Sequence, residues 1–338
     1  MSSADNHLHA AHLHAALARA AAGIPHQDLR RRVTALSHRY RTEQVADATP
    51  GLTDRLDALA YAVVRMPATF RALYAALAQA QPHLDPPVTH LDLGGGTGAA
   101  AWAVAALWPS TCTEIIERQP AAIALGRQLA SSDPALGSGV SAGWRWTRAD
   151  LRNWQAPDGE VGLVTIGYVL NELAPGDRDE LVQKAAAVAT TIAVVEPGSP
   201  GGHRRILAAR ETLLGQGFAI AAPCPHHGPC PVDWCHFGAR LPRTELHRTL
   251  KDGTRNFEDE KFSYVVATRS AVHTAGQRVL TRPTHRKGQV VLDLCTESGA
   301  AERIVVPRSS PSYRPAKAAI WGDEFTLWRP ERSDRQRH

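Results

Sequence analysis

The stretch VTHLDLGGGTGAAAWAVAAL, residues 88–107, carries the strongest structural signal in this chain. Its apolar start predicts a buried strand, its glycines at positions 94, 95, 96 and 98 predict a tight turn, and its Ala-rich end predicts a helix. Glycines in such a turn let the backbone approach a ligand closely, and the N-terminus of the helix favours negative charge. The stretch therefore predicts a turn that binds a nucleotide-type cofactor.

Strands and helices alternate along the chain after this stretch. Strand patterns occur at 111–117, 144–150, 160–170, 191–198, 217–223 and 261–269, and helical patterns at 120–130, 176–189 and 202–215. Repeated units of this length predict an α/β fold with a parallel, doubly wound sheet. If the strand at 217–223 runs parallel to the others, its C-terminal end lies at the ligand-binding edge of the sheet.

Three units are predicted along the chain. Residues 1–86 form a helical N-terminal segment, in which Pro67 is expected to kink or split a long helix. Residues 87–270 form the sheet domain, which contains a Cys-rich loop at 223–240. Residues 278–330 form a small, basic, strand-rich C-terminal element, with strands expected at 289–296 and 302–308.

Acidic residues follow the predicted strands at the places where a nucleoside would lie. Asp92 and the glycines make the order D-x-G-x-G-x-G, with Gly94, Gly96 and Gly98, which resembles motif I of class I S-adenosylmethionine methyltransferases. Glu117 ends the next strand, where an acid binds ribose hydroxyls, and Asp150 ends the third strand, near the expected adenine. These positions predict an S-adenosylmethionine site in a Rossmann-like fold.

The segment GYVLNELAP, residues 167–175, follows the fourth predicted strand. Asn171 and Glu172 in it are expected to face the methyl group of the cofactor. The segment does not match the D/N-P-P-Y/F motif of amino-methylating enzymes, and no general base or cysteine nucleophile stands out. The sequence therefore identifies no catalytic residues. If the chain has an enzymatic activity, that activity is expected to be S-adenosylmethionine-dependent methyl transfer.

Four of the five cysteines form a second constellation. Cys224, Cys230 and Cys235 lie in CPHHGPCPVDWCHF with the spacing C-x5-C-x4-C, and Cys295 follows after 59 residues. Four thiolates can close a tetrahedral zinc site or hold one 4Fe–4S cluster, and the spacing leaves both alternatives open. His226, His227 and His236 could replace a cysteine in a zinc site, but they are expected to be hydrogen-bond donors around the site or solvated loop residues. Cys112 is expected to be a small buried apolar residue.

Composition limits the compartment and the partners. The chain of 338 residues has a net charge of +5, and residues 278–338 supply all of it with 12 basic and 7 acidic residues. An Arg-rich element on a neutral body indicates phosphate contacts, and a solubilising tail is the alternative. No membrane span, secretory signal or convincing mitochondrial presequence is visible, so a cytoplasmic protein is expected, with a mitochondrial one as the alternative.

Taken together, the motifs resemble the methyltransferase-like assembly factors of the mitochondrial small ribosomal subunit and their bacterial relatives. The resemblance runs from about residue 60 onward. The stretches that carry it are RMPATF, LDLGGGTGAAAWA, GYVLNEL, VVEPGSPGG, APCPHHGPCP, WCHF, EDEKFSYVVATR, VVLDLCTESG and AAIWGD. It implies a class I methyltransferase fold, association with the small ribosomal subunit or its rRNA, and a 4Fe–4S cluster on Cys224, Cys230, Cys235 and Cys295.

Three functions follow from these observations. The first is an S-adenosylmethionine- and 4Fe–4S-binding protein that acts in small-subunit assembly or translation. The second is an active methyltransferase on a small molecule or protein, with a structural zinc site. The third is an iron–sulfur redox sensor with a vestigial methyltransferase fold. The sequence does not indicate an oligomeric state.

Overall fold

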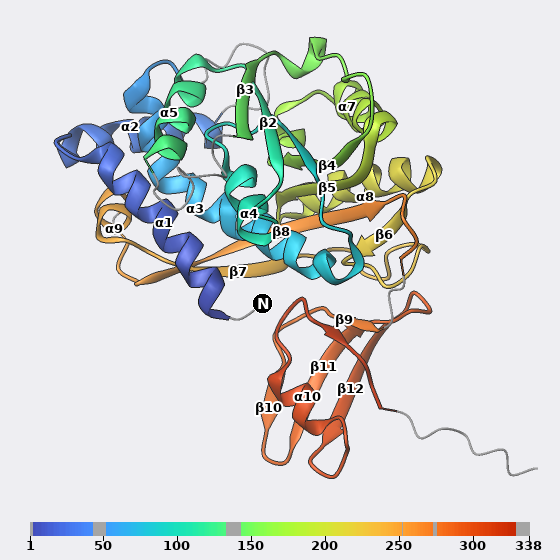
Figure 1. Ribbon diagram of the computed structural model, residues 1–338. Coiled ribbons are helices and arrows are strands. Elements are labelled where there is room, and N and C mark those ends of the chain that lie inside the picture. The colour runs from blue at the N-terminus through green and yellow to red at the C-terminus, as the bar shows by residue number, and fades with distance from the viewer. Residues whose placement is uncertain (1–2, 43–51, 133–142, 252, 273–275, 329–338) are drawn as a thin grey trace, which may run out of the picture.

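The central sheet of the computed structural model contains the predicted strand–turn–helix unit. The structure describes residues 3–42, 52–132, 143–251, 253–272 and 276–328 (Figure 1). The central strands are β1 (Thr89–Leu93), β2 (Cys112–Glu117), β3 (Trp144–Arg148), β4 (Val161–Gly167), β5 (Ala189–Pro197), β6 (Ala219–Ala222), β7 (Phe237–Pro242) and β8 (Phe257–Thr268). Their order is β3-β2-β1-β4-β5-β8-β6, and β7 pairs with β8.

The direction of the strands identifies the fold class. Strands β1 to β5 are parallel, and β8 runs antiparallel to both β5 and β6. Strand β6 therefore runs parallel to β5. The strand predicted at 217–223 thus ends at the same edge of the sheet as β1 to β5. A doubly wound sheet with one inserted antiparallel strand is the class I methyltransferase fold, so the predicted fold class is confirmed.

Helices cover both faces of this sheet. One face carries α1 (Ser3–Ala21), α2 (His26–Thr42), α3 (Arg55–Ala80), α4 (Ala99–Leu107) and α5 (Pro120–Ser131). The other face carries α7 (Pro175–Val188) and α8 (Pro200–Gly215). Each face has its own apolar core, and the helices of the N-terminal segment share one core with α4 and α5. The predicted helical segment therefore packs as a layer of the sheet domain.

Helix α3 is continuous through Pro67, so the expected split of this helix is wrong. The helix begins at an N-cap, Asp54, whose side chain accepts a hydrogen bond from the backbone N–H of Asp57 at 2.8 Å. A proline removes one internal backbone hydrogen bond. Pro67 and most of its neighbours on α3 are buried in the core, and this packing holds the helix together across the missing bond.

A second, five-stranded sheet forms the C-terminal element (Figure 1). Its elements are β9 (Gln277–Val279), β10 (Thr284–Arg286), β11 (Gln289–Cys295), β12 (Ala301–Pro307), α10 (Tyr313–Ala318) and β13 (Glu324–Phe325). Strand β11 pairs antiparallel with β9, β10 and β12. The sheet has a small core of its own around Leu292 and Leu294. Residues 329–330 of the predicted element lie outside the described residues.

Two further details differ from the sequence predictions. Strand β7 begins within the predicted Cys-rich loop, ends just after it, and pairs with β8. The sequence did not predict this strand, because the Pro and Gly residues before it are typical of a loop. Cys112 is exposed, because it is the first residue of β2 and lies at the open N-terminal end of the strand. Within the described part of the chain, no helix is both long and apolar enough to cross a lipid bilayer.

Candidate functional site

The glycine turn after β1 leaves open space above its backbone. Gly94, Gly96 and Gly98 all have positive φ angles, of 74°, 57° and 94°, which side chains disfavour. The backbone N–H of Gly94 donates to the carbonyl of Ile116 at 2.9 Å, which fixes the turn against β2. A Cβ atom at Gly96 would meet no atom within 4 Å, so this face is free for a ligand. The turn therefore has the geometry that the sequence predicted.

Asp92 lies beneath the turn rather than above it. Its side chain is buried, with 2% exposure, and a Cβ atom at Gly95 would lie 2.2 Å from its Oδ2. Its Oδ1 accepts a hydrogen bond from Thr165 at 2.7 Å, and Oδ2 has no partner among the described residues. Burial raises the pKa of Asp92 to about 7, and the nearby charge of Glu117 adds to this shift. Asp92 therefore supports the turn from below.

Glu117 connects the end of β2 to the same turn. Its Oε2 accepts from the backbone N–H of Gly96 at 3.0 Å, and its Oε1 accepts from the N–H of Gln119 at 2.7 Å. Burial raises the pKa of Glu117, and these hydrogen bonds oppose the shift. A carboxylate oxygen can accept more than one hydrogen bond, so Glu117 can hold the turn and still receive a ribose hydroxyl.

Asp150 follows β3 and is paired with Arg152. Its Oδ1 accepts from Nε of Arg152 at 3.1 Å, and its Oδ2 accepts from Nη2 at 2.8 Å. These hydrogen bonds hold the pKa of Asp150 at about 2, although burial opposes them. The structure thus brings Asp150 to the expected sheet edge, with its carboxylate already bound to a neighbouring cation.

The segment after β4 has an unusual backbone. Tyr168 has a φ angle of 60°, which is rare for a bulky residue and is found where the surrounding structure imposes it. Asn171 lies in the short 3₁₀ turn Leu170–Glu172, and its Oδ1 is buried without a hydrogen-bond partner in the described chain. Partial desolvation raises the pKa of Glu172 to about 7, and the charge of Glu117 adds to the shift, although the residue is exposed to solvent.

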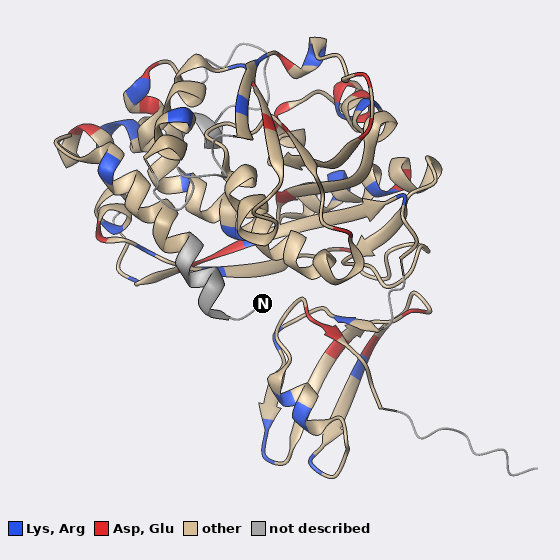
Figure 2. Cartoon of the chain, viewed as in Figure 1, with Lys and Arg blue, Asp and Glu red and all other residues tan. Residues whose placement is uncertain are grey.

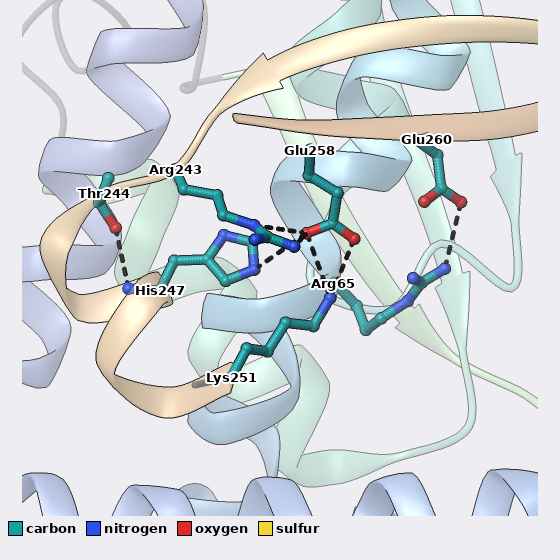
Figure 3. Close-up of polar contacts among 7 residues, drawn as sticks. All are labelled: Arg65, Arg243, Thr244, His247, Lys251, Glu258 and Glu260. Carbon is teal, nitrogen blue, oxygen red and sulfur yellow. Dashed lines mark hydrogen bonds and ion pairs between the residues drawn. The ribbon is translucent and has the colours of Figure 1, made fainter. Parts of the chain in front are cut away.

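A polar group beside this segment was missed by the sequence analysis. The hydroxyl of Tyr168 donates to Oε1 of Glu260 at 2.9 Å, and Arg65 on α3 pairs with the same oxygen at 3.4 Å (Figure 3). Tyr61, one turn before Arg65, is close enough to be influenced by the charges of Arg65 and Glu260. Sequence patterns give no sign that α3 and β8 meet here, because about 195 residues separate Arg65 from Glu260.

A neighbouring carboxylate on β8 is part of the scaffold. Glu258 accepts hydrogen bonds from Arg243 and Lys251, and His247 lies 3.5 Å from it (Figure 3). Burial lowers the pKa of His247 to about 4, so this side chain is neutral at neutral pH. The cluster attaches α9 (Glu245–Lys251) to β8 and has no contact with the glycine turn.

The four predicted cysteines lie at the junction of the two sheets. Cys224 follows β6, Cys235 precedes β7, and Cys295 ends β11. Burial raises the pKa of Cys235 well above its ordinary value, and the charges of the other three cysteines raise it further. Burial likewise raises the pKa of Cys295 to about 12, with Cys224 and Cys230 adding to the shift. The fold thus brings the four thiols close enough to influence one another.

Histidines contact two of these thiols. Nε2 of His226 lies 3.3 Å from Sγ of Cys295, and Nε2 of His203 lies 3.8 Å from Sγ of Cys230. His227 instead accepts a hydrogen bond from the backbone N–H of Ile220, and His236 stacks on Trp234. His226 therefore supports a cysteine, as the sequence analysis expected of this loop, and His203 on α8 is a further residue that it missed.

Two buried guanidinium groups face the cysteines. Arg278 is 3% exposed and donates hydrogen bonds to the carbonyls of Pro223 and Gly322 and to Oε1 of Gln79, at 2.8–3.0 Å. Arg210 is also buried and donates to the carbonyls of His226 and Gly228. Both cations lower the pKa of Cys224, although burial outweighs them. Within the described residues, neither arginine forms an ion pair with a carboxylate.

The four cysteines and the two buried arginines fit a bound group with net negative charge. A buried cation without a counter-ion is costly, and four thiolates around a metal centre would provide the missing charge. In the described ranges, however, no three His, Cys, Asp or Glu side chains are placed to hold one metal ion. A single zinc ion needs its four sulfurs within about 4 Å of one another, whereas a cubane cluster fills a wider space between them.

Comparison with known proteins identifies the relatives of this chain. The family model described as "Mitochondrial small ribosomal subunit Rsm22" matches residues 55–326. The human protein named "Ribosome assembly protein METTL17, mitochondrial" is 27% identical over 302 residues, which is 80% of this chain and 63% of that protein. "Rsm22-cox11 tandem protein 2, mitochondrial" of Schizosaccharomyces pombe is 27% identical over 183 residues, 40% of this chain and 24% of that protein.

Solved methyltransferase structures resemble this chain more distantly. An O-methyltransferase family protein from Burkholderia thailandensis has a TM-score of 0.44 and 14% identity, covering 73% of this chain and 70% of its own. Human N-acetylserotonin methyltransferase in complex with SAM has a TM-score of 0.39 and 13% identity, covering 74% and 69%. The chain spans less than two thirds of the curated relatives, but the family match covers most of its own length. The chain belongs to the Rsm22 family of the mitochondrial small ribosomal subunit.

Proposed function

We propose that this chain acts in assembly of the small ribosomal subunit as a methyltransferase-like protein that binds S-adenosylmethionine and a 4Fe–4S cluster. Membership of the Rsm22 family supports the ribosomal role, as does the name of the human relative, a ribosome assembly protein. The names of the relatives also favour the mitochondrial compartment over the cytoplasmic one. The main structural support for the proposed cluster is that Arg210 and Arg278 lie beside the four cysteines.

The charge balance at the junction supports a bound cluster. In the free protein the raised pKa values keep the thiols of Cys235 and Cys295 protonated at neutral pH, so they give no negative charge to the two buried arginines. Metal binding releases the thiol protons, and four thiolates leave the site with net negative charge. Cys224, Cys230, Cys235 and Cys295 would hold the cluster, and Arg210 and Arg278 would offset its charge.

The choice of a cluster over a zinc ion rests on the family resemblance seen in the sequence. The thiols influence one another electrostatically, but no three candidate ligands in the described residues are placed for one ion. A cluster also suits the position of the site, because Cys295 belongs to the C-terminal sheet and the other three cysteines to the loop between β6 and β7. One bound cluster would therefore join the two sheets.

The glycine turn supports the second ligand. Gly96 would lie against the cofactor, Glu117 would receive the ribose hydroxyls, and Asp150 would lie near the adenine. The unpartnered Oδ1 of Asn171 offers a hydrogen-bond acceptor at the methionine end. S-adenosylmethionine supplies a methyl group on a sulfonium centre. No side chain near the glycine turn is assigned the role of general base, so the proposal includes cofactor binding without a methyl-transfer step.

Anaerobic purification followed by metal analysis tests this proposal. We expect about four iron and four sulfide per chain, absorbance near 400 nm, little zinc, and co-sedimentation with small-subunit assembly intermediates. Cys295→Ser should remove the iron, and Cys112→Ser, which changes the exposed cysteine, should retain it. One zinc per chain without sulfide would support the active-methyltransferase alternative. A full cluster without ribosome association would support the redox-sensor alternative.

A further inference from the structure

Charge is distributed unevenly along the C-terminal sheet. Strand β11 runs from Gln289, at the end far from the central sheet, to Cys295 at the junction. The described acidic residues of this element lie toward the junction, and they are Asp293, Glu297, Glu302, Asp323 and Glu324. Arg286, Lys287 and Arg308 lie at the turn before β11, and α10 carries Arg314 and Lys317. Figure 2 shows Lys and Arg at the outer turns and on the helix of this element. We call these five residues the outer basic surface.

The cations of this surface differ from the other basic residues of the element. Arg278 is buried, Arg282 pairs with Asp259 at 2.8 Å, and Arg303 pairs with Asp293 at 2.6 Å. The five residues of the outer basic surface are exposed, and within the described chain none of them forms an ion pair. Arg278 is therefore not available to a polyanion, and the charges of Arg282 and Arg303 are each paired with a carboxylate.

The backbone holds the outer basic surface together. Arg286 pairs with Gln289 across a tight turn at Lys287 and Gly288, where Gly288 has a φ angle of 76°. The N–H of Arg308 donates to the carbonyl of Gly288 at 2.8 Å, which places the end of β12 beside this turn. These cations therefore project from a defined strand end, and little ordering is needed for them to contact a polyanion.

An exposed aromatic side chain lies beside the start of α10. Trp328 is 56% exposed, and its backbone N–H donates to Oγ of Ser312 at 2.8 Å. Ser312 immediately precedes α10, which carries Arg314 and Lys317. An exposed tryptophan offers a flat face on which an unpaired base can stack, whereas bases within a duplex are already stacked on one another.

We infer that the outer basic surface and Trp328 form a binding site for single-stranded RNA. The cations contact successive phosphates, and one base stacks on the indole of Trp328. This inference rests on the proposed ribosomal role and specifies the surface and the kind of RNA. A duplex would satisfy the cations but would leave the exposed indole unused, so the site is expected to prefer single strands.

Fluorescence anisotropy of the full chain with a labelled mixed-sequence RNA of about 10 nucleotides tests the inference. Arg286→Glu with Lys287→Glu should weaken binding about tenfold or more and make log K less dependent on log salt by about 1.4. Trp328→Ala should weaken single-strand binding by about fivefold or more, with the salt dependence unchanged. The matched control, Arg31→Glu with Arg145→Glu, makes the same charge change at exposed arginines of the main domain and should bind normally.

Two results would overturn the inference. One is equal loss of affinity in the Arg286/Lys287 variant and in the matched control, because the effect would then be one of net charge. The other is binding of an RNA hairpin duplex as tight as that of the single strand, with Trp328→Ala having no effect. Iron content and small-subunit co-sedimentation of the wild-type protein test the proposed function separately, so the failure of either idea can be recognised.

Discussion

Arg278 of the C-terminal sheet donates a hydrogen bond from Nη1 to Oε1 of Gln79 on α3, at 2.8 Å. The same guanidinium also holds the carbonyl of Pro223, next to the first cysteine, and the carbonyl of Gly322. One buried side chain therefore connects the helical layer, the cysteine loop and the C-terminal sheet. It does so beside four cysteines, whose thiolates in the proposed cluster would offset its charge.

Arg278→Met should loosen the C-terminal sheet. The substitution leaves two buried carbonyls and the half-buried amide oxygen of Gln79 without their donor, which should lower the free energy of unfolding by about 3 kcal/mol. Hydrogen exchange should show faster exchange throughout 276–328, with less change in β1 to β5. Arg308→Met is the matched control, because Arg308 lies on the same element, is exposed and forms no ion pair within the described chain. Equal protection of 276–328 in both variants would show that Arg278 does not hold the sheets together.

Cys295→Ser should remove the cluster and release the sheet that carries this residue. The thiol is the only predicted ligand on the C-terminal sheet, so its loss should lower iron and sulfide and make the C-terminal element more sensitive to protease. Cys112→Ser should behave as wild type, because Cys112 is exposed at the start of β2. Retention of full iron and sulfide by the Cys295 variant would remove this residue from the ligand set.

Gly96→Arg should greatly weaken binding of S-adenosylmethionine. A side chain at this position points into the open space above the turn, and the positive φ angle adds strain. Gly176→Arg is the control, because a side chain there also meets no atom within 4 Å but lies at the start of α7. Calorimetry should show loss of binding only in the first variant. Wild-type protein without measurable affinity would indicate a vestigial pocket.

Glu117→Ala should also weaken binding, by more than tenfold. The variant removes the acceptor for the ribose hydroxyls. It also leaves the N–H of Gly96 without the hydrogen bond that it donates to Glu117 in the wild-type protein. Glu114→Ala changes an acid of the same strand that pairs with Arg145 at the surface, and it serves as the control. Equal affinity of the two variants would place the ribose away from Glu117.

Asp92 should make the stability of the protein fall as pH rises toward neutrality. Its pKa is about 7 in the folded protein, above the ordinary value of 3.8, so between these values the unfolded chain has lost a proton that the folded chain keeps. The free energy of unfolding therefore decreases from about pH 4 to 7 and levels off above that range. Asp92→Asn removes this contribution, which should flatten the dependence measured by urea unfolding.

Asp150→Asn tests the opposite pH dependence, in which stability is lost as the pH falls. The pKa of Asp150 is about 2, so its contribution is present above pH 4 and is lost as pH falls toward 2. The effect should be small, because this carboxylate is partly exposed and solvent screens its pairing with Arg152. A pH dependence of the Asp92 variant equal to that of wild type between pH 4 and 7 would show that Asp92 is ionised in the folded protein.

Local patterns were sufficient to predict most of the central sheet. The alternation of apolar strands with helices, and the glycines at 94, 96 and 98, depend on neighbouring residues, so they are visible in sequence. Pro67 and β7 show where such reasoning fails. Pro67 disfavours a helix locally, but the burial of α3 keeps the helix continuous, and β7 becomes a strand because β8 provides its partner.

The sequence alone determined the strand–turn–helix unit, the acids that follow β2 and β3, and the identity of the four cysteines, because each is a local pattern of residue types. Only the tertiary structure decided that Arg210 and Arg278 are buried beside those cysteines, and that Arg65, Tyr168 and Glu260 meet. It also decided which basic residues of the C-terminal sheet are left without an acidic partner. Burial and ion pairing depend on contacts between distant segments, and such contacts arise only when the two sheets and their helices pack together.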